Sequence, residues 1–360
     1  MKKMLIILIL LIVILLLAVS QTAEILREAD FYTQLEKNYV RCDLCPNNCV
    51  LKAGESGICK VRKNINGKLY SLVYGQPVSI NIDPIEKKPL YHFLPGTKVL
   101  SLATVGCNMN CNFCQNWTIS QTSPGEIQVK QVTPAEIIDL AMQNDCPSIA
   151  FTYTEPTVFY EYMYDIAVLA HQNGIKTVWV TCGYINEAPL RKLAPFIDAA
   201  NIDLKGFSEE FYHTYTTGSL LPVLHTLKTA KEEGIYFEIT NLLIPAANDD
   251  PEEIHAMCRW IINDLGAEYP LHFSRFFPNY RLLNRPQTPA KTLRTAYQIA
   301  LEEGLKYVYV GNISGISEDT VCPQCQKKLI IRSGYSLLED HVIDGKCAFC
   351  GEQIPGIFSP

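Results

Sequence analysis

The fold is decided by the stretch Val99-Leu-Ser-Leu-Ala-Thr-Val-Gly106, which runs directly into Cys107-Asn-Met-Asn-Cys111-Asn-Phe-Cys114. The first part is an apolar run typical of a buried strand, and the second places three cysteines on a loop at C-x3-C-x2-C spacing. Three thiolates can hold one cubic iron–sulfur cluster, whereas a cluster used only for electron transfer normally has four. The spacing therefore predicts a cluster with one iron open, as in catalytic zinc sites that keep a free coordination position. A three-cysteine zinc loop completed by a residue elsewhere is the alternative.

The apolar run is the first of seven that alternate with helical stretches. We predict strands at 99–106, 148–154, 176–182, 199–205, 236–244, 271–277 and 306–310. Three helices end at a glycine directly before a strand, namely at Gly174, Gly234 and Gly304. Helix starts are indicated by Thr133-Pro-Ala-Glu136 and Asp250-Pro-Glu-Glu253. Strands that are apolar throughout are buried on both faces and hence parallel, so the pattern predicts an α/β barrel with its chemistry at the C-terminal strand ends.

Polar side chains follow the other predicted strands, as an active site at this edge requires. Glu155 ends the second strand, where it could also cap the following helix. Asp203 and Lys205 end the fourth strand on one side, so they can pair with each other, and a plain barrel salt bridge is the alternative. The further candidates are Asn241, His272, Arg275, Tyr309, Asn312 and His213. His272 could equally be a core residue, Arg275 an anion clamp or part of a structural pair, and His213 a surface histidine.

The loop and the strand ends together resemble the radical S-adenosylmethionine (SAM) superfamily. The resemblance implies a partial TIM-type (β/α) barrel and a 4Fe-4S cluster on Cys107, Cys111 and Cys114, to which SAM binds. It also implies reductive cleavage of SAM, hydrogen abstraction from a substrate, and a low-potential electron donor such as ferredoxin or flavodoxin. The residues expected to hold SAM are Phe113, Glu155, Asp203, Lys205, Asn241 and His272, although Tyr-Thr-Glu155 stands where the superfamily usually has Gly-Gly-Glu.

Over residues 24–320 the chain is similar to the radical SAM protein of the AmmeMemoRadiSam system and to pyruvate formate-lyase activating enzymes. The motifs that carry this closer resemblance are Cys42/Cys45/Cys49/Cys59, Asp83-Pro-Ile-Glu-Lys-Lys-Pro-Leu90, Gly106 to Trp117, Tyr153-Thr-Glu-Pro156 and His272-Phe-Ser-Arg-Phe-Phe-Pro278. Similarity to activating enzymes implies hydrogen abstraction from a glycine of a partner protein. A small-molecule substrate is at least as well supported, because a fold does not fix its substrate.

Two further cysteine sets lie outside the barrel. The N-terminal set, Cys42, Cys45, Cys49 and Cys59, suits zinc or an auxiliary iron–sulfur cluster. The ribbon set, Cys322, Cys325, Cys347 and Cys350, forms two C-x2-C knuckles that predict structural zinc, with a rubredoxin-like iron as the alternative. Eleven of the fourteen cysteines thus have metal-ligand spacing, which requires free thiolates and a reducing compartment. Cys146, Cys182 and Cys258 are expected to be small buried hydrophobes, although Cys182 could face the active site.

The N-terminus has a different character from the rest of the chain. Lys2 and Lys3 precede the apolar run Met4 to Val19, which has the form of a signal peptide or membrane anchor. We predict membrane association through residues 4–19 with a cytoplasmic catalytic domain, and an exported form is the alternative. The net charge of -6 and the lack of a long basic run argue against nucleic-acid binding. The competing function is a membrane-tethered, non-catalytic electron-transfer or metal-ribbon protein.

These patterns divide the chain into four parts. They are a hydrophobic signal or anchor segment at 1–20, a Cys-rich extension at 21–96, the barrel at 97–320 and a four-Cys zinc-ribbon-like module at 321–360. In the extension we expect an amphipathic helix over 24–41 and a hairpin between 67 and 83. The connector from Asp83 to His92 is expected to be a solvated polar face.

Overall fold

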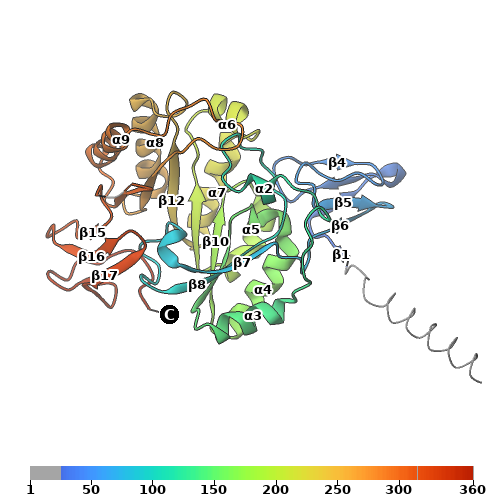
Figure 1. The fold of residues 1–360 in the computed structure, drawn as a ribbon, viewed down its shortest axis with the longest axis horizontal. Coiled ribbons are helices and arrows are strands. Elements are labelled where there is room, and N and C mark those ends of the chain that lie inside the picture. The colour runs from blue at the N-terminus through green and yellow to red at the C-terminus, as the bar shows by residue number, and fades with distance from the viewer. Residues whose placement is uncertain (1–25, 314, 360) are drawn as a thin grey trace, which may run out of the picture.

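The computed structural model describes residues 26–313 and 315–359 (Figure 1). Their centre is one eight-stranded sheet in the order β14-β13-β12-β11-β10-β9-β8-β7. The strands are β7 Ser79–Pro84, β8 Lys98–Ala103, β9 Ser148–Phe151, β10 Lys176–Thr181, β11 Ala199–Asp203, β12 Tyr236–Leu243, β13 Leu271–Arg275 and β14 Val308–Gly311. From β8 to β14 every neighbouring pair is parallel. The seven predicted strands are thus confirmed as a parallel sheet.

The sheet is a partial barrel, because it ends at two edge strands rather than closing on itself. β14 forms one edge, and β7 forms the other by pairing antiparallel with β8, with Ser79 opposite Ala103. The strand interiors are apolar and buried on both faces, as the four residues of β9 illustrate. All C-terminal strand ends therefore point to the same rim, where a site can form.

Helices connect the parallel strands in sequence order. The helices are α2 Trp117–Ser120, α3 Pro134–Gln143, α4 Tyr160–Gln172, α5 Glu187–Leu193, α6 Glu209–Tyr215, α7 Leu220–Glu232, α8 Pro251–Trp260 and α9 Ala290–Glu303. The predicted capping box at Thr133 and Glu136 is present at the start of α3, and Asp250 caps α8. Three other helices, α4, α7 and α9, are followed by a glycine with positive φ, namely Gly174, Gly234 and Gly304. The next N–H then reaches the carbonyl five residues back at 2.9–3.0 Å, which confirms the predicted helix-to-strand joints.

The N-terminal extension consists of short strands, so the prediction of a helix over 24–41 is wrong for its described residues. One sheet contains β2 Tyr32–Gln34, β3 Val40–Cys42 and β4 Val50–Leu51, and a second contains β1 Arg27–Glu28, β5 Arg62–Ile65 and β6 Lys68–Ser71. Positive φ at Phe31, Lys37 and Asn38 interrupts any helix here. The predicted hairpin between 67 and 83 is also wrong, because β6 pairs with β5 while β7 joins the main sheet.

The connector from Asp83 to His92 is buried, so the expectation of a solvated face is wrong. Lys88 is 1% exposed and donates to Asp83 Oδ2 at 2.6 Å. His92 is fully buried between Pro355 and Tyr309, and its Nδ1 lies 2.8 Å from the Pro355 carbonyl. Because a carbonyl only accepts, Nδ1 carries the proton and Nε2 accepts from the Tyr309 hydroxyl at 2.6 Å. Charged and polar groups are tolerated inside when they are paired in this way.

The C-terminal part is a small module of β15 Thr320–Val321, β16 Lys328–Ser333, β17 Ser336–Asp340, β18 Val342–Ile343 and β19 Lys346–Cys347. In Figure 1 it lies on the opposite side of the barrel from β4, β5 and β6. It packs on the connector, where Arg332 donates to the Tyr91 carbonyl at 2.5 Å and covers the Tyr91 ring at 4.3 Å.

No helix within residues 26–313 and 315–359 is long and apolar enough to cross a bilayer. The predicted anchor at residues 4–19 lies outside the described part of the chain.

Candidate active site

The C-terminal strand ends surround a cavity of about 710 Å³. All three cysteines of the cluster loop (residues 107–114) line it, together with the apolar side chains of Met109 and Phe113. Of the predicted SAM-binding residues, the cavity lining includes Phe113, Glu155, Asp203, Lys205 and His272. Segments that are far apart in the sequence therefore meet at the rim where the parallel sheet predicts the chemistry.

The cluster loop is held by its peptide groups, which leaves its thiols free for a ligand. The N–H groups of Asn110 and Asn112 each donate at 2.9 Å to carbonyls at the C-terminal end of α6, those of Thr216 and Tyr215. The Met109 N–H lies 3.4 Å from Cys107 Sγ, and Cys114 Sγ lies 3.3 Å from the hydroxyl of Ser120. Thiols that line one cavity and receive hydrogen bonds of this kind fit an iron–sulfur cluster.

Gly106 sets the position where the cluster loop leaves β8. Its φ is +95°, and a Cβ there would lie 2.7 Å from the Cys59 carbonyl oxygen and 2.5 Å from Cγ1 of Val61. Only glycine avoids both the backbone strain and the clash. Gly106, directly before the cluster loop, thus packs against the N-terminal extension.

Glu155 lies at the end of β9 and is 2% exposed. Its Oε1 accepts from the hydroxyls of Thr157 and Thr181 at 2.6 and 2.7 Å, and its Oε2 accepts from the Cys182 N–H at 2.8 Å. Glu155 also caps the 3-10 helix Pro156–Phe159 through the Thr157 N–H. The capping role and the cavity position considered from the sequence therefore occur together.

Asp203 and Lys205 follow β11 and form an ion pair of 2.7 Å, as the sequence predicts. Lys205 is also near the thiols of Cys111 and Cys182. Burial works against the charged form of Lys205, but Asp203 and these thiols outweigh it and raise its pKa well above the usual value. The cavity therefore has a fixed positive charge beside Cys111.

His272 on β13 lines the cavity and is also part of a buried network. Its Nε2 lies 2.5 Å from Oε2 of Glu238, a residue that the sequence reasoning missed. Oε1 of Glu238 accepts from the N–H groups of Tyr91 and His92 at 2.8 and 2.7 Å. Burial raises the pKa of Glu238, but His272 and the peptide donors lower it overall below 4.5. The sequence signal for this network is that Glu238 is a charged residue within the otherwise apolar first half of β12.

Asn241, Arg275 and His213 lie outside the cavity lining. Asn241 is 2% exposed and donates to the Leu204 carbonyl at 2.7 Å, because successive residues of β12 alternate and its neighbours Thr240 and Leu242 line the cavity instead. Arg275 donates to the Thr288 carbonyl at 2.8 Å, a structural contact. His213 is a surface residue beside Glu209.

Two residues singled out at other strand ends line the cavity. Asn312, which follows β14, lines the cavity. Tyr309 of β14 does not, and its hydroxyl is hydrogen-bonded to His92 instead. Cys182 also lines the cavity, and its peptide N–H donates to Glu155.

A second group that the sequence reasoning missed comes from the connector. Lys88 lines the cavity, and its Nζ lies 4.5 Å from the centre of the Tyr153 ring. Asp83 binds Lys88, Lys87 and the Tyr153 hydroxyl. Burial lowers the pKa of Lys88 to about 8, although Asp83 partly opposes this. Tyr335 of the C-terminal module also lines the cavity.

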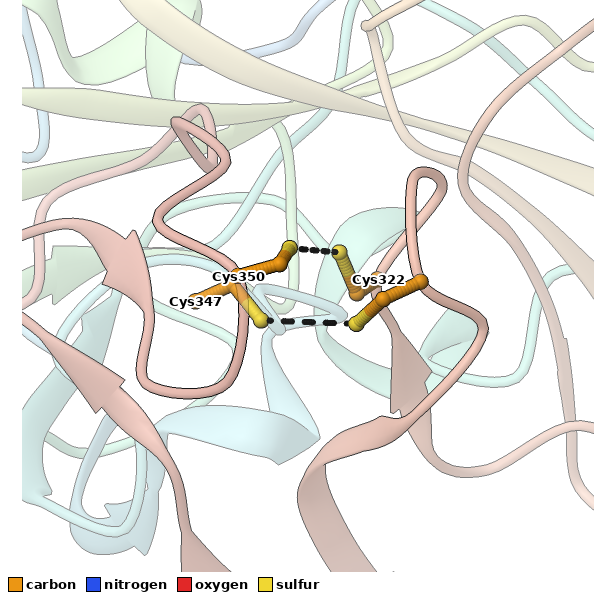
Figure 2. Close-up of side chains that lie close together, drawn as sticks. Cys322, Cys347 and Cys350 are labelled. Carbon is orange, nitrogen blue, oxygen red and sulfur yellow. Dashed lines mark hydrogen bonds between the residues drawn. The ribbon is translucent and has the colours of Figure 1, made fainter.

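The ribbon set comes together as the knuckle spacing predicts. Figure 2 shows the two knuckles facing each other, with sulfur distances of 3.6 Å from Cys322 to Cys350 and 3.7 Å from Cys325 to Cys347. All four sulfur atoms lie within 4.8 Å of one another. Four ligands bound at about 2.3 Å around one tetrahedral ion are about 3.8 Å apart, so the set fits a single metal ion.

Comparison with known proteins agrees with this geometry. The Radical SAM superfamily profile matches residues 101–261. A protein of Methanocaldococcus jannaschii that is described as uncharacterized is 49% identical over 332 residues, which cover 91% of this chain and 99% of that protein. The chain belongs to the radical SAM superfamily. The pyruvate formate-lyase-activating enzyme of Clostridium pasteurianum is 22% identical over 169 residues, which cover 45% of this chain and 69% of the enzyme.

Solved structures of radical SAM proteins are among the matches of this chain. The structure of Streptococcus suis SuiB bound to S-adenosylmethionine has a TM-score of 0.49 at 13% identity and covers 64% of this chain and 53% of that chain. A radical SAM methyltransferase from Sphaerobacter thermophilus has a TM-score of 0.48 at 16% identity, over 64% of this chain and 71% of that chain. Radical SAM proteins are enzymes that use a 4Fe-4S cluster and SAM, so the chain belongs to an enzyme superfamily.

Proposed function

We propose that this protein reductively cleaves SAM at a 4Fe-4S cluster held by Cys107, Cys111 and Cys114, and then abstracts hydrogen from a substrate. The observation that carries the proposal is the cavity in which these three thiols meet the polar ends of the parallel strands. With one electron supplied, the cluster and SAM together produce methionine and a radical that removes a hydrogen atom from a substrate. An electron donor of the ferredoxin or flavodoxin class supplies that electron.

The chain's own residues position and shield the reactants. Lys205 presents a positive charge that can bind the carboxylate of SAM, while Asp203 keeps that charge in place. Glu155 presents a carboxylate near the same wall for the ammonium group, fixed by three neighbouring donors. Phe113 and Met109 give the cavity an apolar wall, which suits an adenine ring and excludes water from the radical.

The substrate class is proposed on two different grounds. Relatives named pyruvate formate-lyase-activating enzyme support abstraction from a glycine of a partner protein. Tyr335 of the C-terminal module, which lines the cavity, supports a small molecule. We favour the small molecule, since a cavity that a folded module borders leaves less room for a protein segment. The ribbon set is proposed to bind structural zinc, which would hold that module in place.

The test is anaerobic incubation of the reconstituted protein with dithionite and SAM, followed by measurement of 5'-deoxyadenosine. We expect formation of this product by the wild type and none by Cys111→Ala. The matched control is Cys258→Ala, which removes a buried thiol that lines neither the active-site cavity nor the cavity of the N-terminal set, and it should leave the product yield unchanged. A fully loaded cluster that yields no product, with or without lysate of the source cell as a supply of substrate, would refute the proposal.

A further inference from the structure

The N-terminal set surrounds a small cavity of its own. Cys42, Cys45, Cys49 and Cys59 all line this cavity, and its lining shares no residue with that of the active-site cavity. Cys42 ends β3, while Cys45 and Cys49 lie in the loop before β4 and Cys59 in the loop before β5. Three separate parts of the extension therefore bring their thiols to the same cavity.

Peptide groups around this cavity are arranged as they are around bound thiolates. The N–H groups of the residues two positions after Cys42, Cys45 and Cys59 donate toward the respective thiols. Such donors stabilise the negative charge of metal-bound sulfur. Gly57 permits the close approach, because a Cβ there would lie 3.6 Å from Cys49 Sγ and 3.7 Å from Cys59 Sγ.

Arg62 adds a buried positive charge to the same cavity. Its side chain is 2% exposed, its Nη1 pairs with Glu161 Oε1 at 2.8 Å, and its Nη2 donates to the Asp30 carbonyl. Its Nε–H is buried and has no partner among the described residues, although Arg62 lines the cavity. An unpartnered guanidinium N–H is costly inside a protein, so a sulfur acceptor in the cavity accounts for it.

The spacing of the four thiols favours a cluster over a single ion. The ribbon set has sulfur contacts of 3.6 and 3.7 Å, as one tetrahedral ion requires. Among the described residues, ligand atoms that all lie within 4.8 Å of one another occur at the ribbon set and not at the N-terminal set. The N-terminal thiols line their small cavity without forming such a close group. A cubic cluster keeps its four thiolates further apart, because four irons and four sulfides lie between them.

The N-terminal set lies next to the cluster loop. Asn108, the residue after Cys107, lines the N-terminal cavity, and its carbonyl accepts from Asn47 Nδ2 at 2.8 Å. Gly106 packs against the carbonyl of Cys59. Residues on both sides of Cys107 therefore contact the N-terminal set or its cavity.

We propose that Cys42, Cys45, Cys49 and Cys59 hold a second 4Fe-4S cluster that passes electrons to the cluster on the loop. The role as a relay rests on the proposed function, whereas the second cluster itself does not. One electron moves from a reduced low-potential carrier to the N-terminal cluster and then to the active-site cluster, and no bond or proton is exchanged in either transfer. Four cysteines suit such a cluster, because electron transfer needs no open iron.

The site is tested by metal analysis of protein reconstituted under anaerobic conditions. The wild type should hold about eight iron and eight sulfide per chain, and the C107A/C111A/C114A variant should keep about four of each. Zinc without sulfide in that variant would overturn the proposal. Because this measurement is made without the active-site cysteines, it is independent of whether the protein cleaves SAM.

Two variants in the C107A/C111A/C114A background locate the remaining cluster. Adding Cys322→Ser and Cys325→Ser should leave iron and sulfide in place, whereas adding Cys42→Ala and Cys45→Ala should remove both. The opposite pattern would assign the cluster to the ribbon set and overturn the proposal. If the N-terminal variant fails to fold, the ribbon variant still shows which set binds the cluster. Sulfide that remains in a protein without the active-site and ribbon cysteines must be bound at the N-terminal set.

The relay is tested by the rate at which reduced ferredoxin reduces the active-site cluster in an otherwise intact chain. Cys42→Ala/Cys45→Ala should lose most of this rate, while dithionite, a small reductant, should still reduce the cluster. Cys146→Ala, which removes a buried thiol outside all three sets, should behave as the wild type. Equal rates of reduction by ferredoxin in all three proteins would refute the relay.

Discussion

Replacing Asp83 with asparagine should destabilise the protein strongly, and in a way that depends on pH. Asp83 and Lys88 form a 2.6 Å ion pair whose side chains are 6% and 2% exposed. The amide of Asp83→Asn has nearly the same shape but no charge, so Lys88 is left buried without a counterion. Removal of one partner from such a pair costs about 3–5 kcal/mol.

The pKa of Lys88 determines how this cost changes with pH. In the folded protein burial lowers this pKa to about 8 from 10.5, and Asp83 limits the decrease. Without Asp83 it falls further, so folding of the variant releases a proton from Lys88 between that lower value and about pH 10.5. The unfolded chain then binds more protons than the folded variant, so the variant gains up to about 1.4 kcal/mol of stability per pH unit across this window.

The wild type gains stability from Lys88 in the same way, but only above pH 8, where its own lysine loses the proton on folding. The difference between the two proteins should therefore shrink between about pH 6 and about pH 8 and stay constant above about pH 8. This dependence separates an uncompensated lysine from a simple loss of packing, which would be the same at every pH.

The assay is urea unfolding followed by tryptophan fluorescence, with wild type and variant compared at several pH values. The matched control is Asp43→Asn, which breaks the 2.6 Å pair of Arg41 and Asp43. Because those side chains are 48% and 29% exposed, the control should lose little stability and show no such pH dependence. A deficit of Asp83→Asn that is constant or grows from about pH 6 to about pH 8 would refute the reasoning.

Three other changes test the rest of the site. Glu238→Gln should lower the free energy of unfolding by about 3 kcal/mol, because its uncharged amide keeps one oxygen for the N–H groups of Tyr91 and His92 but puts an NH2 group in place of the carboxylate oxygen that His272 Nε2 contacts, and unfolding in urea measures this. Lys205→Met should weaken SAM binding by roughly 10- to 100-fold in anaerobic equilibrium dialysis while iron content stays constant, and unchanged affinity would contradict its role. Cys347→Ser should remove one metal ion per chain, measured by mass spectrometry, and lower the melting temperature; unchanged metal content would exclude a metal at the ribbon set.

The barrel could be predicted from the sequence because its signals are local. Each parallel strand is a short apolar run, and α4, α7 and α9 are followed by a glycine that the left-handed turn requires, as at Gly174 and Gly304. The extension was predicted less well, since its strands have only two to four residues and depend on tertiary pairing. β7 is the clearest case: its alternating residues indicate a strand, but only the exposed edge of β8 decides that it pairs there and not with β6.

The cavity lining could be predicted where polar residues stand at the end of a strand, as at Glu155, Asp203 and Lys205. It could not be predicted where a residue's meaning depends on a distant partner. From the sequence Lys88 is expected to be a solvated charge, whereas in the structure it contacts Asp83 and the Tyr153 ring. Asn241 is the reverse case, because its polarity in an apolar run suggests the cavity while the alternation of β12 turns it to the other side.

The connector explains why the C-terminal module matters to the active site. The N–H of Tyr91 donates to Glu238, which also contacts the cavity residue His272. From the other side Arg332 of the module binds the Tyr91 carbonyl and covers its ring. The position of His272 therefore depends on a chain of buried contacts that begins in the module. Loss of the metal proposed for the ribbon set should accordingly disturb SAM binding, although the set is separate from the residues that line the cavity.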